Sequence, residues 1–178
     1  MIGFPARSET VPYYHRYIDR VRSDDVIHAL ETQLEELPRL FVTISEDKSL
    51  HRYAPDKWSI RQLLSHINDC ERLFVSRAFW FARGFPTPLP SFDQDLAANS
   101  AHADGITWSA HREEFLSIRK ATLSFFRNLP EDAWLRTGIA SDNPFTVRSL
   151  AYIAAGHAAH HVAILQERYL RTESAAMQ

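Results

Sequence analysis

The stretch Trp58-Ser-Ile-Arg-Gln-Leu-Leu-Ser-His66 carries the clearest helix start in this chain of 178 residues. Ser59 and Gln62 have the spacing of a capping box, in which each side chain bonds the backbone N–H of the other residue. Apolar residues then recur every three or four positions to about Arg83, and Gly84 is typical of the position just after a helix. The sequence therefore predicts a long amphipathic helix that buries one face.

Three further segments have the same helical period, at residues 27–44, 108–129 and 146–171. Pro38 lies inside the first segment, and we expect a kink or break there because proline lacks the backbone N–H that a helix uses. Pro130 ends the second segment. Thr146 is the expected N-cap of the last, after the turn signal Asn143-Pro144. Four such helices, with only five glycines and few alternating patterns, predict an all-α four-helix bundle.

A long loop separates the second and third predicted helices, at residues 84–105. It contains three prolines and no sustained period, with room for a helical turn near Gln94–Asn99. Loops of this length in compact domains are often functional or mobile, so we expect this one to shape or gate a pocket. We expect one domain over residues 1–178, with residues 1–22 as an N-terminal extension and residues 172–178 as a frayed tail.

The composition argues against several classes of protein. A formal net charge of −2 leaves no broad basic surface for nucleic acid or anionic lipid. No apolar run reaches the length of a membrane span, about 18 residues, and the first residues lack the apolar core of a signal peptide. A single cysteine, Cys70, excludes an intrachain disulfide and fits a reducing compartment. We therefore expect a cytoplasmic protein with no nucleic-acid or membrane partner.

The last predicted helix contains a cluster of histidines, Gly156-His-Ala-Ala-His-His161. Positions i and i+4 are neighbours on one face of a helix, so His157 and His161 can point at the same small volume. His157 and His160 can do the same, and spacing alone does not choose between the two pairs. Two neutral imidazoles, with a third from elsewhere, form an open divalent-metal site. The competing interpretation is that these imidazoles are ordinary polar residues on a helix flank.

His66 is the best third ligand by position, because it lies on the other strongly capped helix. Asp69, one turn away, could orient a metal-bound imidazole of His66 by accepting its second N–H. A solvated carboxylate paired with Arg72 or Arg77 is an equally good interpretation of Asp69. Cys70 could be a thiolate ligand, although a buried free cysteine usually behaves as a small hydrophobe. The remaining histidines are expected at the surface or in loops, namely His15, His28, His51, His102 and His111.

With these residues in view, the chain resembles the DinB/YfiT-like superfamily, in its DinB-like domain branch. The stretches that carry the resemblance are Tyr53–Arg61, His66–Arg72, Ala82–Gly84, Leu89–Asp93, Gly156–His161 and Glu167–Leu170. The resemblance implies a four-helix bundle, often a homodimer, with a divalent metal such as zinc or nickel. It also implies that three histidines hold the metal, which here are His66, His157 and His161. His160 is then a neighbour of the site and not a ligand.

Members of the family include thiol-dependent S-transferases and isomerases, and others are described as hydrolases. The leading hypothesis is therefore a metal-dependent enzyme that joins a low-molecular-weight thiol cosubstrate to a small electrophilic substrate. The alternative is a metal-dependent hydrolase, in which Asp69 or Glu71 could assist a bound water. A third hypothesis is a non-catalytic metal-binding stress protein, with Cys70 or a carboxylate closing the fourth ligand position. The sequence assigns no catalytic residue beyond the metal ligands.

Overall fold

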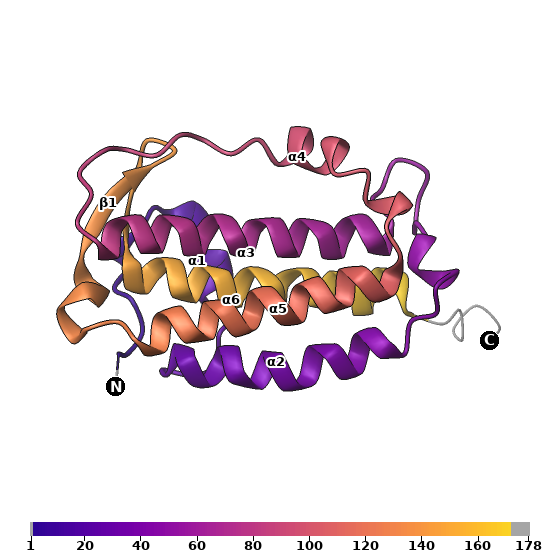
Figure 1. Cartoon of the computed structure of the whole chain (residues 1–178), viewed down its shortest axis with the longest axis horizontal. Coiled ribbons are helices and arrows are strands. Elements are labelled where there is room, and N and C mark those ends of the chain that lie inside the picture. The colour runs from indigo at the N-terminus through magenta and orange to yellow at the C-terminus, as the bar shows by residue number, and fades with distance from the viewer. Residues whose placement is uncertain (1, 172–178) are drawn as a thin grey trace.

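Four long helices lie side by side along the length of the molecule (Figure 1). They are α2 (Val26–Val42), α3 (Ile60–Ala82), α5 (Trp108–Arg127) and α6 (Val147–Ile164). A π-helical turn, Leu165–Tyr169, extends α6. The computed structural model describes residues 2–171, so the stretch expected to be a frayed tail lies outside the described residues. The predicted all-α four-helix bundle is confirmed.

Two short helices and a hairpin complete the fold. Helix α1 (Pro12–Ile18) packs against α6, within the stretch expected to be an N-terminal extension. Helix α4 (Gln94–Ser100) lies on the long connection between α3 and α5, close to the helical turn expected there. That connection runs along the outer side of α3 from one end of the bundle to the other (Figure 1). Short 3₁₀ turns occur at residues 7–9, 48–50, 103–105 and 131–135.

Side-chain caps fix where the bundle helices begin. The capping box of Ser59 and Gln62 starts α3, with Ser59 Oγ accepting from the Gln62 N–H at 3.0 Å. Thr146 caps α6 in the same way and accepts from the Ser149 N–H at 2.9 Å. Both N-caps were predicted from the sequence.

The sequence predicts a kink or a break at Pro38. Helix α2 is continuous through Pro38, so the predicted break does not occur. A proline removes one hydrogen bond from a helix interior and still permits helical φ and ψ values. Leu37 and Phe41, on either side of it, are both buried in the core. Packing of these side chains outweighs the local cost of the proline.

A two-stranded antiparallel hairpin, β1 (Thr137–Ala140) and β2 (Asn143–Thr146), was not predicted. Asn143-Pro144, where the sequence predicts a turn, is the start of β2. The turn itself is Ser141 and Asp142, whose φ values of +51° and +59° suit a two-residue hairpin loop. The long connection is tied to this hairpin, because the Leu89 N–H donates to Ile139 O at 2.9 Å.

The core consists of two clusters of buried apolar side chains. One surrounds α1, the second half of α3 and the first half of α6, and the other surrounds the remaining halves of α3 and α6. The boundary between the clusters falls beside His66 on α3 and beside His157 on α6. Histidines from both helices therefore meet at one level of the bundle. No helix in the described part of the chain is both long enough and apolar enough to cross a membrane.

Candidate metal centre

Three histidine side chains converge between α3 and α6. His157 and His161 lie one turn apart on α6, and α3 contributes His66. Nε2 of His157 is 3.2 Å from Nε2 of His66 and 3.1 Å from Nε2 of His161. The ligand nitrogens of all three lie within 4.8 Å of one another. Among residues 2–171, no other group of histidine, cysteine and carboxylate side chains has this geometry.

The donor set fits a divalent cation. Nitrogen ligands of a tetrahedral zinc-type ion lie about 2.0–2.1 Å from it and therefore roughly 3.3 Å from one another. The two Nε2–Nε2 separations are close to that value. A ring nitrogen makes one hydrogen bond, as donor or as acceptor, yet Nε2 of His157 faces two other nitrogens at hydrogen-bond distance. A shared cation would satisfy all three lone pairs at once.

Burial keeps the three imidazoles neutral. It lowers the pKa of His66 to about 4 and, with the nearby His66 and His160, that of His161 to about 3. The pKa of His157 is also lowered well below 6.5, first by burial and then by His161 and His66. Neutral imidazole is the form that binds metal, so all three are ready to act as ligands at neutral pH.

Aromatic rings enclose the group. Tyr17 of α1 and Phe74 of α3 meet the His157 ring at centroid distances of 5.2 and 5.7 Å. Trp58 lies 4.8 Å from the His66 ring. These contacts restrict the orientation of the His157 and His66 imidazoles. Tyr17 could not be predicted as a neighbour of the site, because α1, with seven residues, is too short to show a helical period.

The model of the DinB superfamily matches residues 29–165. This chain belongs to the DinB superfamily. YfiT from Bacillus subtilis, described as a probable metal-dependent hydrolase with an unusual four-helix bundle topology, is similar in structure. Its TM-score is 0.69 at 17% sequence identity, over 94% of this chain and 91% of YfiT. No curated protein sequence matches the chain.

The mycothiol-dependent maleylpyruvate isomerase also shares the fold of this DinB protein. Its TM-score is 0.61 at 15% sequence identity. The match covers 84% of this chain and only 61% of the isomerase. At such low identities the two structures establish the fold, and the resemblance predicted from the sequence is confirmed at the level of the family.

His160 lies outside the three-nitrogen group of this DinB protein. Its ring is half-buried and faces Tyr17, with ring centroids 5.4 Å apart. The ring is also 5.0 Å from that of His161. Helix α3 brings His66 beside His157 and His161, and His160 lies outside this group.

Neither carboxylate near His66 in sequence touches its imidazole. Asp69 lies 3.5 Å from Arg72 at the surface, which is the paired arrangement that the sequence also allowed. Glu71 forms a buried ion pair with Arg119, with Oε1 accepting from Nε and Oε2 from Nη2, both at 2.8 Å. Glu71 therefore faces α5, and the expectation that it could assist at the site finds no support in its contacts.

The thiol of Cys70 lies beside the three-histidine group. Its Sγ is 3.7 Å from both ring nitrogens of His66. Burial raises the pKa of the thiol to about 12, with a smaller contribution from Asp69. At neutral pH Cys70 is therefore a protonated, small apolar group, in line with the interpretation that the sequence favoured.

One of the remaining histidines is not where it was expected. His111 is buried in α5 and its Nε2 lies 2.9 Å from Ala103 O, so it ties α5 to the end of the long connection. The prediction of a surface or loop position was wrong for this residue, because His111 lies on the buried face of α5, between Trp108 and Phe115. His28, His51 and His102 are exposed.

Two pockets reach the three-histidine group. The His157 pocket has a volume of about 200 Å³ and is lined by Tyr14, Tyr17, Cys70, Phe74, Arg77 and His157, among others. The His161 pocket, of about 260 Å³, is lined mainly by Tyr53, Trp58, Leu63, His161 and Tyr169. Arg77 was singled out in the sequence only as a partner for Asp69, and the structure places it elsewhere.

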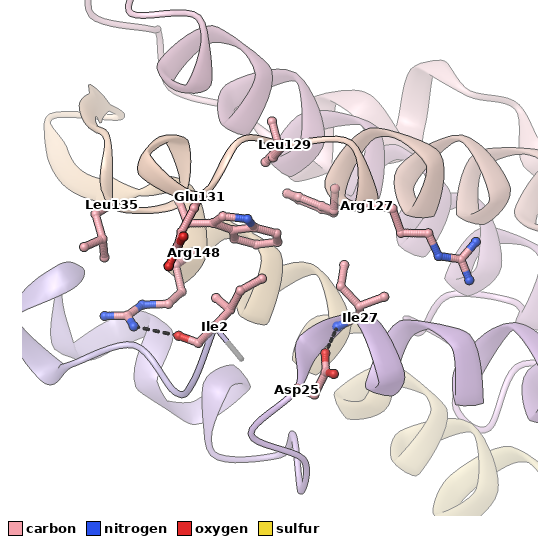
Figure 2. Close-up of a pocket in the computed structure, with 10 residues that line it drawn as sticks. Ile2, Asp25, Ile27, Arg127, Leu129, Glu131, Leu135 and Arg148 are labelled. Carbon is pink, nitrogen blue, oxygen red and sulfur yellow. Dashed lines mark hydrogen bonds between the residues drawn. The ribbon is translucent and has the colours of Figure 1, made fainter.

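A larger pocket, of about 530 Å³, lies away from the histidines (Figure 2). It opens between the start of α2 and the end of α5, with Asp25, Ile27 and Leu129 in its wall. Figure 2 shows that Arg148 on its rim is held by the backbone carbonyl of Ile2. The wall contains no histidine or cysteine, so this pocket offers no comparable donor set.

Proposed function

We propose that this protein is a divalent-metal-dependent enzyme that joins a low-molecular-weight thiol to a small electrophilic substrate. His66, His157 and His161 hold the metal ion. The observation that carries the proposal is the convergence of their ring nitrogens, with Nε2 of His157 at 3.2 and 3.1 Å from the other two. Structural neighbours described as metal-dependent and as mycothiol-dependent support the choice of reaction class.

A divalent cation held by three imidazoles supplies Lewis acidity, which lowers the pKa of a thiol or water ligand toward neutrality. The residues of this chain do the rest. The three histidines bind as neutral donors, and the rings of Tyr17, Phe74 and Trp58 hold two of them in place. Burial of His66 and His157 lowers the local dielectric constant and strengthens the electrostatic interactions at the site.

Two pockets at one site favour a reaction of two substrates. The His157 pocket and the His161 pocket approach the histidine group through different members of it. One pocket can accept the thiol and the other the electrophile, so that sulfur and carbon meet at the histidines. A hydrolase needs only one organic substrate beside its water.

The hydrolase alternative also lacks a protein base. Asp69 is engaged with Arg72 and Glu71 with Arg119, and within the described residues no carboxylate joins the three-histidine group. A thiol that loses its proton to solvent on binding requires no such base. The non-catalytic alternative requires a closed ligand set, for which Cys70 is the nearest donor.

Elemental analysis tests the metal site. Wild-type protein should carry about one divalent ion per chain, and His157→Ala and His161→Ala should lose it because each removes one of three donors. His28→Ala, an exposed histidine of α2, is the matched control and should keep the ion. Full metal content in both site variants would show that the ion is held elsewhere.

A conjugation assay tests the reaction class. Metal-loaded protein is mixed with cellular thiols and 1-chloro-2,4-dinitrobenzene, and product is followed by absorbance. A carbon–sulfur bond forms, the carbon–chlorine bond breaks, and chloride and the thiol proton pass to solvent. Thiol-independent hydrolysis of esters or amides by the same sample, without conjugation, would support the hydrolase. Reversible protection of Cys70 from alkylation by the metal, with neither activity, would support the non-catalytic protein.

Four finer expectations stay predictions. Zinc or nickel is the expected metal, and elemental analysis identifies it. The expected homodimer is tested by sedimentation, and the expected cytoplasmic location by fractionation of the source cells. A single domain over the whole chain is likewise proposed, and a single unfolding transition is the measurement that tests it.

A further inference from the structure

Arg77 differs from the other buried arginines of this protein. Three arginines in the described part of the chain are buried, namely Arg61, Arg77 and Arg119. Arg61 pairs with Glu46 at 2.5 Å, and Arg119 pairs with Glu71 at 2.8 Å. Arg77 is only 2% exposed, and among residues 2–171 no carboxylate lies within ion-pair distance of it. Buried charges are normally paired, and the buried guanidinium of Arg77 is an exception because it lacks a counter-ion.

The hydrogen bonds of Arg77 leave part of its guanidinium free. Nη2 donates to Pro90 O at 2.9 Å and to Ser141 Oγ at 2.8 Å, which holds the long connection and the hairpin turn against α3. Nε is buried and has no partner. An N–H group in this state is an unfilled donor, and a cationic one prefers a charged acceptor.

Arg77 is one of the residues that line the His157 pocket. The same wall contains His157 of α6 and Tyr14 of α1. Tyr14 and Arg77 line the same pocket, where burial raises the pKa of the Tyr14 hydroxyl and the Arg77 guanidinium opposes that rise. A neutral phenol O–H beside a guanidinium offers an anion a second donor.

We propose that the His157 pocket binds the carboxylate of a small substrate, with Arg77 as its counter-ion and Tyr14 as a second donor. This assignment rests on the proposed function, since it places part of the electrophilic substrate in a pocket of that site. Arg77 follows Cys70 by seven residues, which is roughly 10 Å along α3. The carboxylate is therefore a handle for binding, several bonds away from the carbon that reacts beside the histidines.

The same contacts would exist if Arg77 only fastened the loop and the hairpin to α3. The two roles differ in one measurable property, which is whether the free Nε–H responds to a carboxylate. NMR detects this N–H directly, and the Arg77→Lys variant assigns its resonance. Zinc-loaded wild-type protein is titrated with sodium acetate, benzoate and succinate at constant ionic strength, and in parallel with acetamide, benzamide and succinamide.

We expect a saturable shift of the Arg77 Nε–H resonance with at least one carboxylate and none with its amide. Calorimetry with that carboxylate should show at least tenfold weaker binding to Arg77→Gln and an intermediate loss for Arg77→Lys. Arg83→Gln, an exposed arginine at the end of the same helix, is the control for net charge and should bind as wild type does. If Arg77→Gln does not fold, the wild-type titration and Arg77→Lys still decide the question.

No saturable shift with any of the three carboxylates, or an equal shift with the amides, would overturn the assignment and leave Arg77 a structural residue. That result together with normal metal content would leave the proposed function intact. Loss of the proposed function, through unchanged metal content in His157→Ala and His161→Ala, would leave a carboxylate-dependent shift of Arg77 unaffected. The two failures are thus separable.

Discussion

At the scale of single residues, burial of imidazoles makes the stability of this protein depend on pH. The pKa of His66 is about 4 in the folded protein, against 6.5 for a free side chain. Between these values the unfolded chain binds more protons than the folded one, so lowering the pH through this window favours unfolding. Stability from this residue is present above pH 6.5 and is lost by about pH 4.

The prediction is that metal-free protein loses free energy of unfolding between pH 6.5 and 4. One pKa unit corresponds to about 1.4 kcal/mol, so His66 alone should account for roughly 2–3 kcal/mol. Urea unfolding in the presence of a chelator measures this. His66→Asn, which cannot take up a proton, should show a shallower dependence, and His28→Asn on the surface should behave as wild type. Equal slopes in all three proteins would contradict the burial argument.

Residue spacing predicted part of the site and left the rest open. The i, i+4 relation places His157 and His161 on one face of the helix, and the i, i+3 relation does nearly the same for His157 and His160. Only the folded structure shows that His66 of α3 lies beside His157 and His161. Asp69 and Glu71 are both within about one turn of His66, and their partners Arg72 and Arg119 decide where they point. Arg77 gives no local signal, since only the assembled fold shows that it lacks a carboxylate.

At the scale of elements, the contact between α1 and α6 depends on Gly156. A Cβ atom built there would lie 1.9 Å from the backbone oxygen of Tyr17. Backbone cannot rotate away as a side chain can, so Gly156→Ala should push α1 off α6. Helix propensity alone would favour alanine by about 1 kcal/mol. We expect overpacking to reverse the sign and to lower the free energy of unfolding by about 1–3 kcal/mol.

Urea unfolding of Gly156→Ala tests this contact. Gly105→Ala is the matched control, because no atom lies within 4 Å of its added Cβ, and it should change stability by only a few tenths of a kcal/mol. Stabilisation of the protein by Gly156→Ala would show that α1 does not lie as close to α6 as described.

The ion pair between Glu71 and Arg119 links three helices. Arg119 of α5 also donates to Gln33 Oε1 of α2 at 2.5 Å, and Glu71 comes from α3. Glu71→Gln leaves the buried guanidinium without a counter-charge, so we expect a loss of about 3–5 kcal/mol in the free energy of unfolding. Glu114→Gln removes a carboxylate from the exposed pair with Arg72 and should cost about 1 kcal/mol or less.

Urea unfolding of both variants gives the comparison, with metal content measured on the folded proteins. Metal content should stay near one ion per chain in each, because neither carboxylate touches the histidine group. If Glu71→Gln had normal stability but lost its metal or its activity, the result would show that Glu71 acts at the metal site.

The helices were predictable because period and caps are local, whereas the deviations from prediction are tertiary effects. Pro38 stays within α2 because buried residues on both sides hold the helix together. The hairpin could not be predicted because each strand has only four residues and because Pro144, in β2, is typical of a turn. Gly138 in β1 lies where a Cβ would meet the Phe81 ring at 2.0 Å, a constraint imposed by α3 and invisible in the sequence.

At the scale of the whole molecule, a cation bound at the histidine group would join α3 to α6. Such an ion binds the folded chain and not the unfolded one, so it adds about 2.7 kcal/mol to the free energy of unfolding at a free concentration 100 times its Kd. For a chain of this length, that corresponds to a rise in Tm of roughly 5–10 °C. Both core clusters end at the level of the histidines, so the ion would stabilise them together.

Thermal unfolding with and without zinc measures this effect on chelator-treated protein. The rise in Tm should appear in wild type and in His28→Ala and should be absent from His66→Ala, which removes the only donor from α3. A single, sharper transition at the higher Tm is expected, because the ion couples the two halves of the core. If His66→Ala gains as much as wild type, the ion is held by α6 alone, and the site does not join the two helices.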